Sequence, residues 1–159
     1  MESTQEINVQ LQKVNELIPV HSLWDGFWIY DFERGNLTIT CSFDRTAYRN
    51  FDIEFKNVSF FNIPSEWRDT DVPGDILFKL SDKNEFQKLY PEVEIAEQTV
   101  FAIDLLFRIN STLSLNHRFH IVADWVAAAA CLVGDARPNV YYKDPFEKEG
   151  FTCFKNRIL

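Results

Sequence analysis

The stretch that decides the fold is Asn36–Asn62, NLTITCSFDRTAYRNFDIEFKNVSFFN, which alternates apolar and polar residues in two separate runs. The first run covers 37–43, the second covers 51–55, and a polar segment joins them. Residues two apart in a β-strand share a face. The alternation therefore predicts two β-strands, each with one apolar face toward a core and one polar face toward solvent.

The apolar positions shift by one residue after Phe55. Up to Phe55 they are odd-numbered, whereas Val58 and Phe60 are even-numbered. A change of parity inside one strand is the signature of a β-bulge, which adds one residue and turns the following side chains to the other face. We therefore expect a bulge near Lys56 and Asn57.

Similar alternation elsewhere predicts further strands. The segment 26–32 should pair with the strand that follows it, because Gly35-Asn36 can adopt the left-handed backbone of a tight hairpin turn. Additional strands are predicted over 76–80, 99–109, 119–126 and 138–144. The alanine run within 127–133 has high helix propensity, but the alternation that enters it favours a continued strand.

Two helices are expected. Residues 3–18 carry apolar side chains at spacings of four, three and four, Ser3 and Glu6 fit a capping box, and Pro19 can end the helix. An irregular N-terminal arm is the alternative, since part of this segment also suits a strand. A short helix is expected near 82–90. Together these elements predict an α+β fold, mostly antiparallel β: a twisted sheet or sandwich of about six to eight strands.

Length and charge restrict the function. The 159 residues contain no evident linker or repeat, so we expect a single domain over 1–159. The chain has 24 acidic and 16 basic residues and a net charge of −8. Nucleic-acid binding and adsorption to anionic membranes need basic surfaces, so neither is expected, whereas a basic protein partner is permitted.

The N-terminal segment lacks the basic and apolar regions of a signal peptide. The longest apolar run, 125–134, is too short to cross a bilayer. The cysteines at 41, 131 and 153 show no metal-type or redox-type spacing. These features predict a cytoplasmic protein without membrane association.

The chain carries no short motif of a nucleotide-binding, metal-dependent or hydrolytic enzyme. We therefore expect no cofactor and no metal, and we favour a non-enzyme. The pair His117-x-x-His120 would point to opposite faces of a strand, which does not suit a metal site. If the protein has a catalytic or ligand pocket, its candidate polar groups are Asp104, His120 and Asp124, among aromatic side chains.

Aromatic residues beside carboxylates are the candidates for a recognition surface. Trp67 precedes Asp69 and Asp71, and the pair Tyr141-Tyr142 lies near the C-terminus. Tryptophan and tyrosine bury large areas at interfaces while keeping a polar group, and neighbouring carboxylates would suit a basic partner. We predict these five residues as exposed binding residues.

The first functional interpretation is a non-enzymatic cytoplasmic protein that binds another protein. In size, acidity and general layout the chain resembles small bacterial immunity proteins, which neutralise a partner toxin. That resemblance implies a toxin as the partner, although no diagnostic motif is matched residue by residue. The alternatives are a small-molecule-binding protein or enzyme with the pocket named above, and a self-assembling structural protein with an exposed apolar strand edge.

Overall fold

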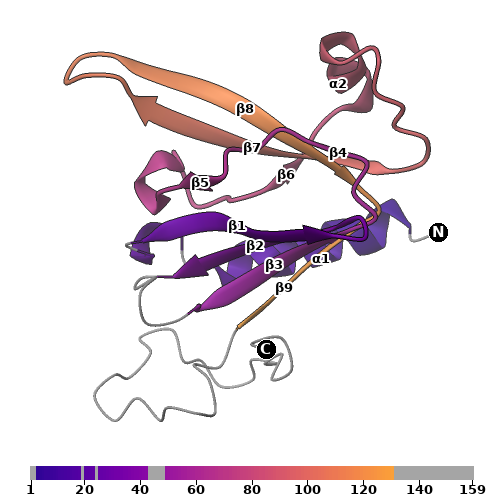
Figure 1. Cartoon of the computed structure of the whole chain (residues 1–159), viewed down its shortest axis with the longest axis horizontal. Helices are drawn as coiled ribbons and strands as arrows, with labels where there is room; N and C mark the ends of the chain where they lie inside the picture. Colours follow the sequence, from indigo (N-terminus) through magenta and orange to yellow (C-terminus); the bar gives the residue numbers. More distant parts are fainter. Residues whose placement is uncertain (1–2, 19, 24, 43–48, 131–159) are drawn as a thin grey trace.

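The computed structural model describes residues 3–18, 20–23, 25–42 and 49–130. Two antiparallel sheets lie one above the other in Figure 1 and converge at one end, where β4 and the β8–β9 junction meet. The first sheet has the order β5-β1-β2-β3-β9, and the second has the order β4-β8-β7-β6. Helix α1 packs along β9, and α2 contacts β7.

The α+β class with mostly antiparallel strands is confirmed. The helices are α1 (Thr4–Leu17) and α2 (Lys83–Leu89), with 3₁₀ turns η1 (Val20–Ser22) and η2 (Asp69–Asp71). The strands are β1 (Gly26–Glu33), β2 (Asn36–Ser42), β3 (Phe51–Lys56), β4 (Phe60–Phe61), β5 (Glu66–Trp67), β6 (Lys79–Leu80), β7 (Thr99–Arg108), β8 (Ser114–Ala123) and β9 (Trp125–Ala130). The described residues thus form nine strands, slightly more than expected, because three of them are only two residues long.

Helix α1 begins as its sequence predicts. The Ser3 hydroxyl accepts a hydrogen bond from the Glu6 amide at 3.3 Å, and the Ser3 amide donates to the Glu6 carboxylate at 2.7 Å. This capping box satisfies two amides that a helix start otherwise leaves without partners. The apolar face of α1 is buried in the core through Ile7, Leu11 and Val14.

The strand predicted over 76–80 is shortened by a side chain of α1. The Asn15 carboxamide oxygen accepts bonds from the amides of Leu77 and Phe78, each at 3.0 Å, and its nitrogen donates to the Phe78 carbonyl at 2.8 Å. Because the backbone at 77–78 bonds to Asn15, only Lys79–Leu80 joins the sheet, as β6.

The β1–β2 hairpin forms where expected, although the left-handed residues differ. Its turn is Arg34-Gly35, with φ of 52° and 78°, while Asn36 already pairs with Glu33. Positive φ at both central residues is the geometry of a two-residue hairpin turn that matches strand twist.

The bulge predicted near Lys56 and Asn57 is not present, and the parity change has another cause. Strand β3 ends at Lys56, and Asn57 adopts a left-handed backbone with φ of 51°. The chain then leaves the first sheet and enters the second as β4. Val58 and Phe60 therefore change face because the chain changes sheet.

A second segment crosses between the sheets beside this one, at the junction of β8 and β9. The Asp124 amide donates to the Lys56 carbonyl at 3.0 Å, and the Ser59 amide donates to the Val122 carbonyl at 3.0 Å. The Asn57 carboxamide also donates to the Asp124 carboxylate at 2.7 Å. We call this pair of crossing segments, 56–60 and 122–125, the crossover; strands that change sheets at such corners are typical of packed β-sheets.

The alanine run confirms the strand interpretation, since 127–130 pair with β3 as part of β9. Residues 131–133 and the strand predicted over 138–144 lie outside the described residues. Both faces of β2 are buried, so its polar face does not point to solvent as expected. Thr40 is fully buried and its hydroxyl donates to the Phe51 carbonyl at 3.1 Å.

Aromatic contacts join the two sheets at the centre of the core. Phe55 of β3 contacts Phe101 of β7 edge to face, with ring centroids 5.3 Å apart, and contacts Phe78 in the same way at 5.2 Å. All three side chains are buried. Such pairs add to the stabilisation from burial itself.

Replacing Phe55 with alanine should lower the free energy of unfolding by about 3–5 kcal/mol, because the deletion leaves a cavity between the sheets. The matched control is Ile76→Ala, at a side chain that is 64% exposed, and its effect should stay within about 0.5 kcal/mol. Urea denaturation followed by circular dichroism measures both. Equal effects of the two substitutions would contradict the placement of the core.

Candidate functional site: a cleft beside Trp125

Trp67 is buried, so the prediction that it is exposed is wrong. Its side chain is 3% exposed and stacks on Phe27 of β1, with ring centroids 5.3 Å apart and ring planes within 8°. The short strand β5 holds it there by pairing Trp67 with Phe27. The acidic residues next to it could not reveal this burial, because it arises from a strand pair distant in sequence.

The two predicted binding aspartates shape the turn η2. Asp69 is 5% exposed, contrary to expectation, and its carboxylate accepts the Thr70 amide at 2.8 Å. The Asp71 carboxylate accepts the Arg68 amide at 2.9 Å. The Tyr141-Tyr142 pair lies outside the described residues.

Trp67→Ala should destabilise the protein by about 3–5 kcal/mol, since it removes a buried ring that is stacked on Phe27. Trp67→Phe is the matched variant: it keeps a ring in the stack and loses an indole Nε1 that has no hydrogen-bond partner among the described residues. It should cost clearly less than the alanine change in thermal denaturation. A neutral Trp67→Ala would refute this assignment.

The three candidate pocket residues occupy two places. Asp104 and His120 lie on one face of the β7–β8 pair, where Arg118 Nε donates to Asp104 Oδ1 at 2.7 Å and Lys79 also bonds to this carboxylate. The Arg118 hydrogen bond holds the pKa of Asp104 below its usual value, against the opposing effect of burial. Asp124 instead lies in the crossover and lines the cleft described below.

His120 is buried in an aromatic cluster. Its ring contacts Phe86 of α2 at 5.2 Å and Tyr90 at 5.9 Å between centroids, and its Nδ1 has no hydrogen-bond partner among the described residues. Burial lowers the pKa of His120 below 6.5, and the positive charge of Arg118 lowers it further, while Asp104 acts in the opposite direction. The imidazole is thus kept neutral in the folded protein.

This lowered pKa predicts a loss of stability in mild acid. Below a pH of about 6.5 the unfolded chain binds a proton at His120 that the folded protein resists, so the free energy of unfolding should fall as pH decreases through this range. His120→Phe fits the aromatic cluster without an ionisable group and should remove part of that fall. Urea denaturation at several pH values tests it, with the exposed His117→Gln as control; an unchanged pH dependence in His120→Phe would contradict it.

A concave surface adjoins the crossover among the described residues. A cleft of about 930 Å³ lies between the crossover, the N-terminal part of α1 and the loop before β7. Its lining residues are Ile7, Lys56, Asn57, Ser59, Ala96, Glu97, Gln98, Thr99, Asp124 and Trp125. A second hollow of about 450 Å³ adjoins the first turns of α1, and Trp125 lines both. We call the two hollows together the Trp125 cleft.

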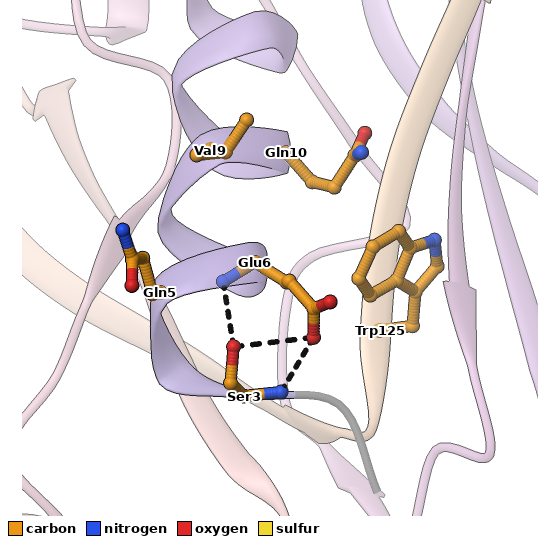
Figure 2. Close-up of a pocket in the computed structure, with 6 residues that line it drawn as sticks. All are labelled: Ser3, Gln5, Glu6, Val9, Gln10 and Trp125. Atoms are coloured by element: carbon orange, nitrogen blue, oxygen red, sulfur yellow. Dashed lines mark hydrogen bonds between the residues drawn. The ribbon is translucent and has the colours of Figure 1, made fainter.

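Figure 2 shows the part of the cleft beside α1. The side chains of Glu6 and Gln10 extend from the helix toward the Trp125 indole, and Gln5 and Val9 border the hollow. Both hydrogen bonds from Ser3 go to Oε2 of Glu6, which leaves Oε1 available within the described part of the chain. The capping box therefore fixes a carboxylate next to an aromatic ring.

The cleft is acidic. Among the described residues, its charged lining consists of the acidic Glu6, Glu97 and Asp124 and the basic Lys56. Trp125 is partly exposed among them. An indole face and several carboxylates both attract a cation, so this arrangement suits a lysine or arginine side chain better than an anion.

Hydrogen bonds and two unusual backbone conformations hold the floor of the cleft. Gln98 donates to the Asn57 carbonyl and accepts from the Ser59 hydroxyl, which ties the loop to the crossover. Both Asn57 and Ala96 have positive φ, 51° and 47°, although neither is glycine. For alanine this conformation is costly, and such residues concentrate at functional sites.

Sequence reasoning named only Asp124 of this site, and it grouped that residue with Asp104 and His120, which do not line the cleft. Its one local signal is the dipeptide Asp124-Trp125, a carboxylate next to an aromatic residue in a segment that we assigned to an ordinary strand. The opposing group, Glu6, is more than a hundred residues away in sequence and is brought near only because α1 packs on β9.

Three comparisons with known proteins add no relative. No protein-family model, no curated protein and no solved structure matches this chain. Among the described residues, no three His, Cys, Asp or Glu side chains gather as metal ligands would. Nor is any described helix sufficiently long and apolar to span a membrane. The proposal for the function of this chain therefore rests on the geometry and charge of the Trp125 cleft.

Proposed function

We propose that this chain is a non-enzymatic cytoplasmic protein that binds a basic protein partner, of the toxin-neutralising type, and that the Trp125 cleft receives a lysine or arginine side chain of that partner. The observation that supports this most directly is a partly exposed indole that lines two hollows, one lined also by Glu6 and the other by Glu97 and Asp124. Aromatic anchors beside charged groups are common at the energetic centres of protein interfaces.

The chemistry of the cleft favours a cation on an extended side chain. A guanidinium or ammonium over an indole face gains about 0.5–1 kcal/mol at an exposed site, and more where water is excluded. Carboxylates that line the same hollows can accept charge-assisted hydrogen bonds from such a cation. Arginine suits such a lining, since its planar guanidinium stacks on aromatic rings and its N–H groups donate to carboxylates.

The overall charge supports the same kind of partner. With a net charge of −8, the chain attracts a basic protein over a distance and raises the rate of encounter. Rapid capture is useful to a protein that must neutralise a toxin before the toxin reaches its target. The size and acidity of the chain agree with this role.

A second candidate function is the binding of a small cationic molecule. The larger hollow, about 930 Å³, lies within the usual range for ligand sites. Such sites are mostly apolar with a few polar groups, and this lining combines the apolar side chains of Ile7, Ala96 and Trp125 with charged, amide and hydroxyl side chains. The cleft would prefer a cation in both cases. The two candidate functions therefore differ in whether that cation belongs to a protein or to a small molecule.

The proposal is tested with the product of the gene adjacent to the gene of this chain. That product should arrest growth when expressed alone, and co-expression of this chain should restore growth. The double variant Glu6→Gln/Glu97→Gln should weaken the binding of this chain to the purified product of the adjacent gene by about tenfold, because it removes two exposed charges of the site. Glutamine can replace glutamate in a capping box, so α1 should remain intact.

The matched control is Glu16→Gln/Glu85→Gln, which removes the same charge from α1 and α2 at residues that do not line the cleft. It should bind like the wild type in calorimetry at 0.15 M salt. Equal affinities of the two double variants would exclude the cleft as the contact site. Absence of both toxicity and binding would exclude the toxin-neutralising role, and binding of arginine methyl ester alone, abolished by the cleft variant, would favour the small-molecule candidate.

A further inference from the structure

The β7–β8 hairpin extends beyond the rest of the molecule, with its tip projecting at the upper left of Figure 1. Strand β4 pairs with β8 only at 121–122, and β6 pairs with β7 only at 101–102. In the described part of the chain, no strand pairs with the outer edges of 103–108 or 114–119. We call residues 103–119 the outer hairpin.

The hydrogen-bonding groups on the free edge of β8 can be assigned from its neighbours. His120 bonds outward, since its carbonyl accepts the Asn62 amide and its amide donates to the Asn62 side chain. Antiparallel strands alternate inward and outward groups, and the β7–β8 register has no shift. The amides and carbonyls of Ser114, Asn116 and Arg118 therefore point away from β7, as a template for another strand.

One face of the outer hairpin is apolar and exposed. Leu115, which is 53% exposed, shares a face with Phe107 and Phe119, and Ile109 and Leu113, 59% and 52% exposed, follow directly at the tip, where the Ile109 amide donates to the Leu113 carbonyl at 2.9 Å. Those two rings contact each other edge to face at 6.1 Å. Exposed apolar side chains gathered on one element indicate an interaction surface rather than an ordinary solvent-exposed surface.

The outer hairpin also differs in charge from the rest of the chain. Residues 105–118 contain Arg108 and Arg118 and no acidic residue, in a chain whose net charge is −8. Arg118 is already paired with Asp104. Two copies of this acidic chain repel one another through their net charge, and residues 105–118 of the outer hairpin can approach their equivalents without meeting a carboxylate, since its one acidic residue, Asp104, is paired with Lys79 and Arg118.

We propose that the outer hairpin is a self-association surface, in which β8 pairs antiparallel with β8 of a second copy about a two-fold axis at Asn116. The axis follows from the outward-facing residues, which then form hydrogen-bonded pairs: Asn116 with its equivalent, and Ser114 with Arg118 of the other copy. On the apolar face, Leu115 meets His117 and Leu113 meets Phe119 across the axis. No like charges stand opposite one another, as stable cross-strand pairing requires.

A second copy is the occupant that these observations favour. The free edge of β8 can pair antiparallel with the same edge of a second copy. One such interface satisfies the outward amides and carbonyls of both chains and closes as a dimer. An unrelated strand could use the same backbone groups, but it would have no reason to match the spacing between Leu113 and Phe119. This dimer does not involve the Trp125 cleft and is independent of the proposed function.

Analytical ultracentrifugation of the full chain over micromolar to millimolar concentration tests the proposal. The wild type should show a concentration-dependent monomer–dimer equilibrium. Asn116→Pro removes an outward amide that the hairpin itself does not use, so it should weaken dimerisation at least tenfold while the circular dichroism spectrum stays the same. Asn116→Ser keeps the amide and should dimerise like the wild type.

Two further measurements make the outcome decisive. Added salt should strengthen the dimer, because it screens repulsion between the acidic bodies, whereas an interface held by ion pairs would weaken. Glu6→Gln/Glu97→Gln should leave the dimer unchanged, which separates it from the Trp125 cleft. A wild type that is monomeric up to millimolar concentration, or a folded Asn116→Pro variant that dimerises normally, would overturn the proposal.

Discussion

The structure depends on the crossover, where two segments distant in sequence pass together from one sheet to the other. Backbone bonds between Asp124 and Lys56 and between Ser59 and Val122 hold the segments side by side, and the Asn57–Asp124 side-chain bond completes the set. Because β3 continues into β4 and β8 continues into β9, the two sheets share a continuous backbone at this corner. Their apolar faces must therefore pack against each other, with Phe55 at the centre.

The same corner generates the candidate site. The larger hollow lies against the crossover and is bordered also by α1 and by the loop at 96–99. Asn57 accommodates the turn with a left-handed backbone, while the Gln98 carboxamide donates to the Asn57 carbonyl and accepts from the Ser59 hydroxyl. The cleft is thus a consequence of the fold, and the acidic residues around Trp125 give it a chemical preference.

The two sheets have different edges. The first sheet adjoins the proposed binding cleft, whereas the second carries the free strand edge proposed for self-association. The first sheet is bordered by the short strand β5 at one edge and carries α1 along β9 at the other. The second sheet has two-residue strands at both edges, which leaves most of the β7–β8 pair without neighbours in the described part of the chain. The ion pairs of Asp104 with Lys79 and Arg118 protect part of that surface with charge, whereas the edge beyond Arg118 has no such protection.

What the sequence by itself determined was the local structure. The capping box of α1, the β1–β2 hairpin, the strands at 51–56 and 99–108 and the α+β class all follow from spacing within a few residues, where the period of a helix or a strand is directly visible. Only the tertiary structure decided which side chains are exposed and where the chain changes sheet. The burial of Trp67 on Phe27, the passage at Asn57 and the approach of Glu6 to Trp125 each depend on contacts between residues far apart in the chain, and local periodicity carries no information about such contacts.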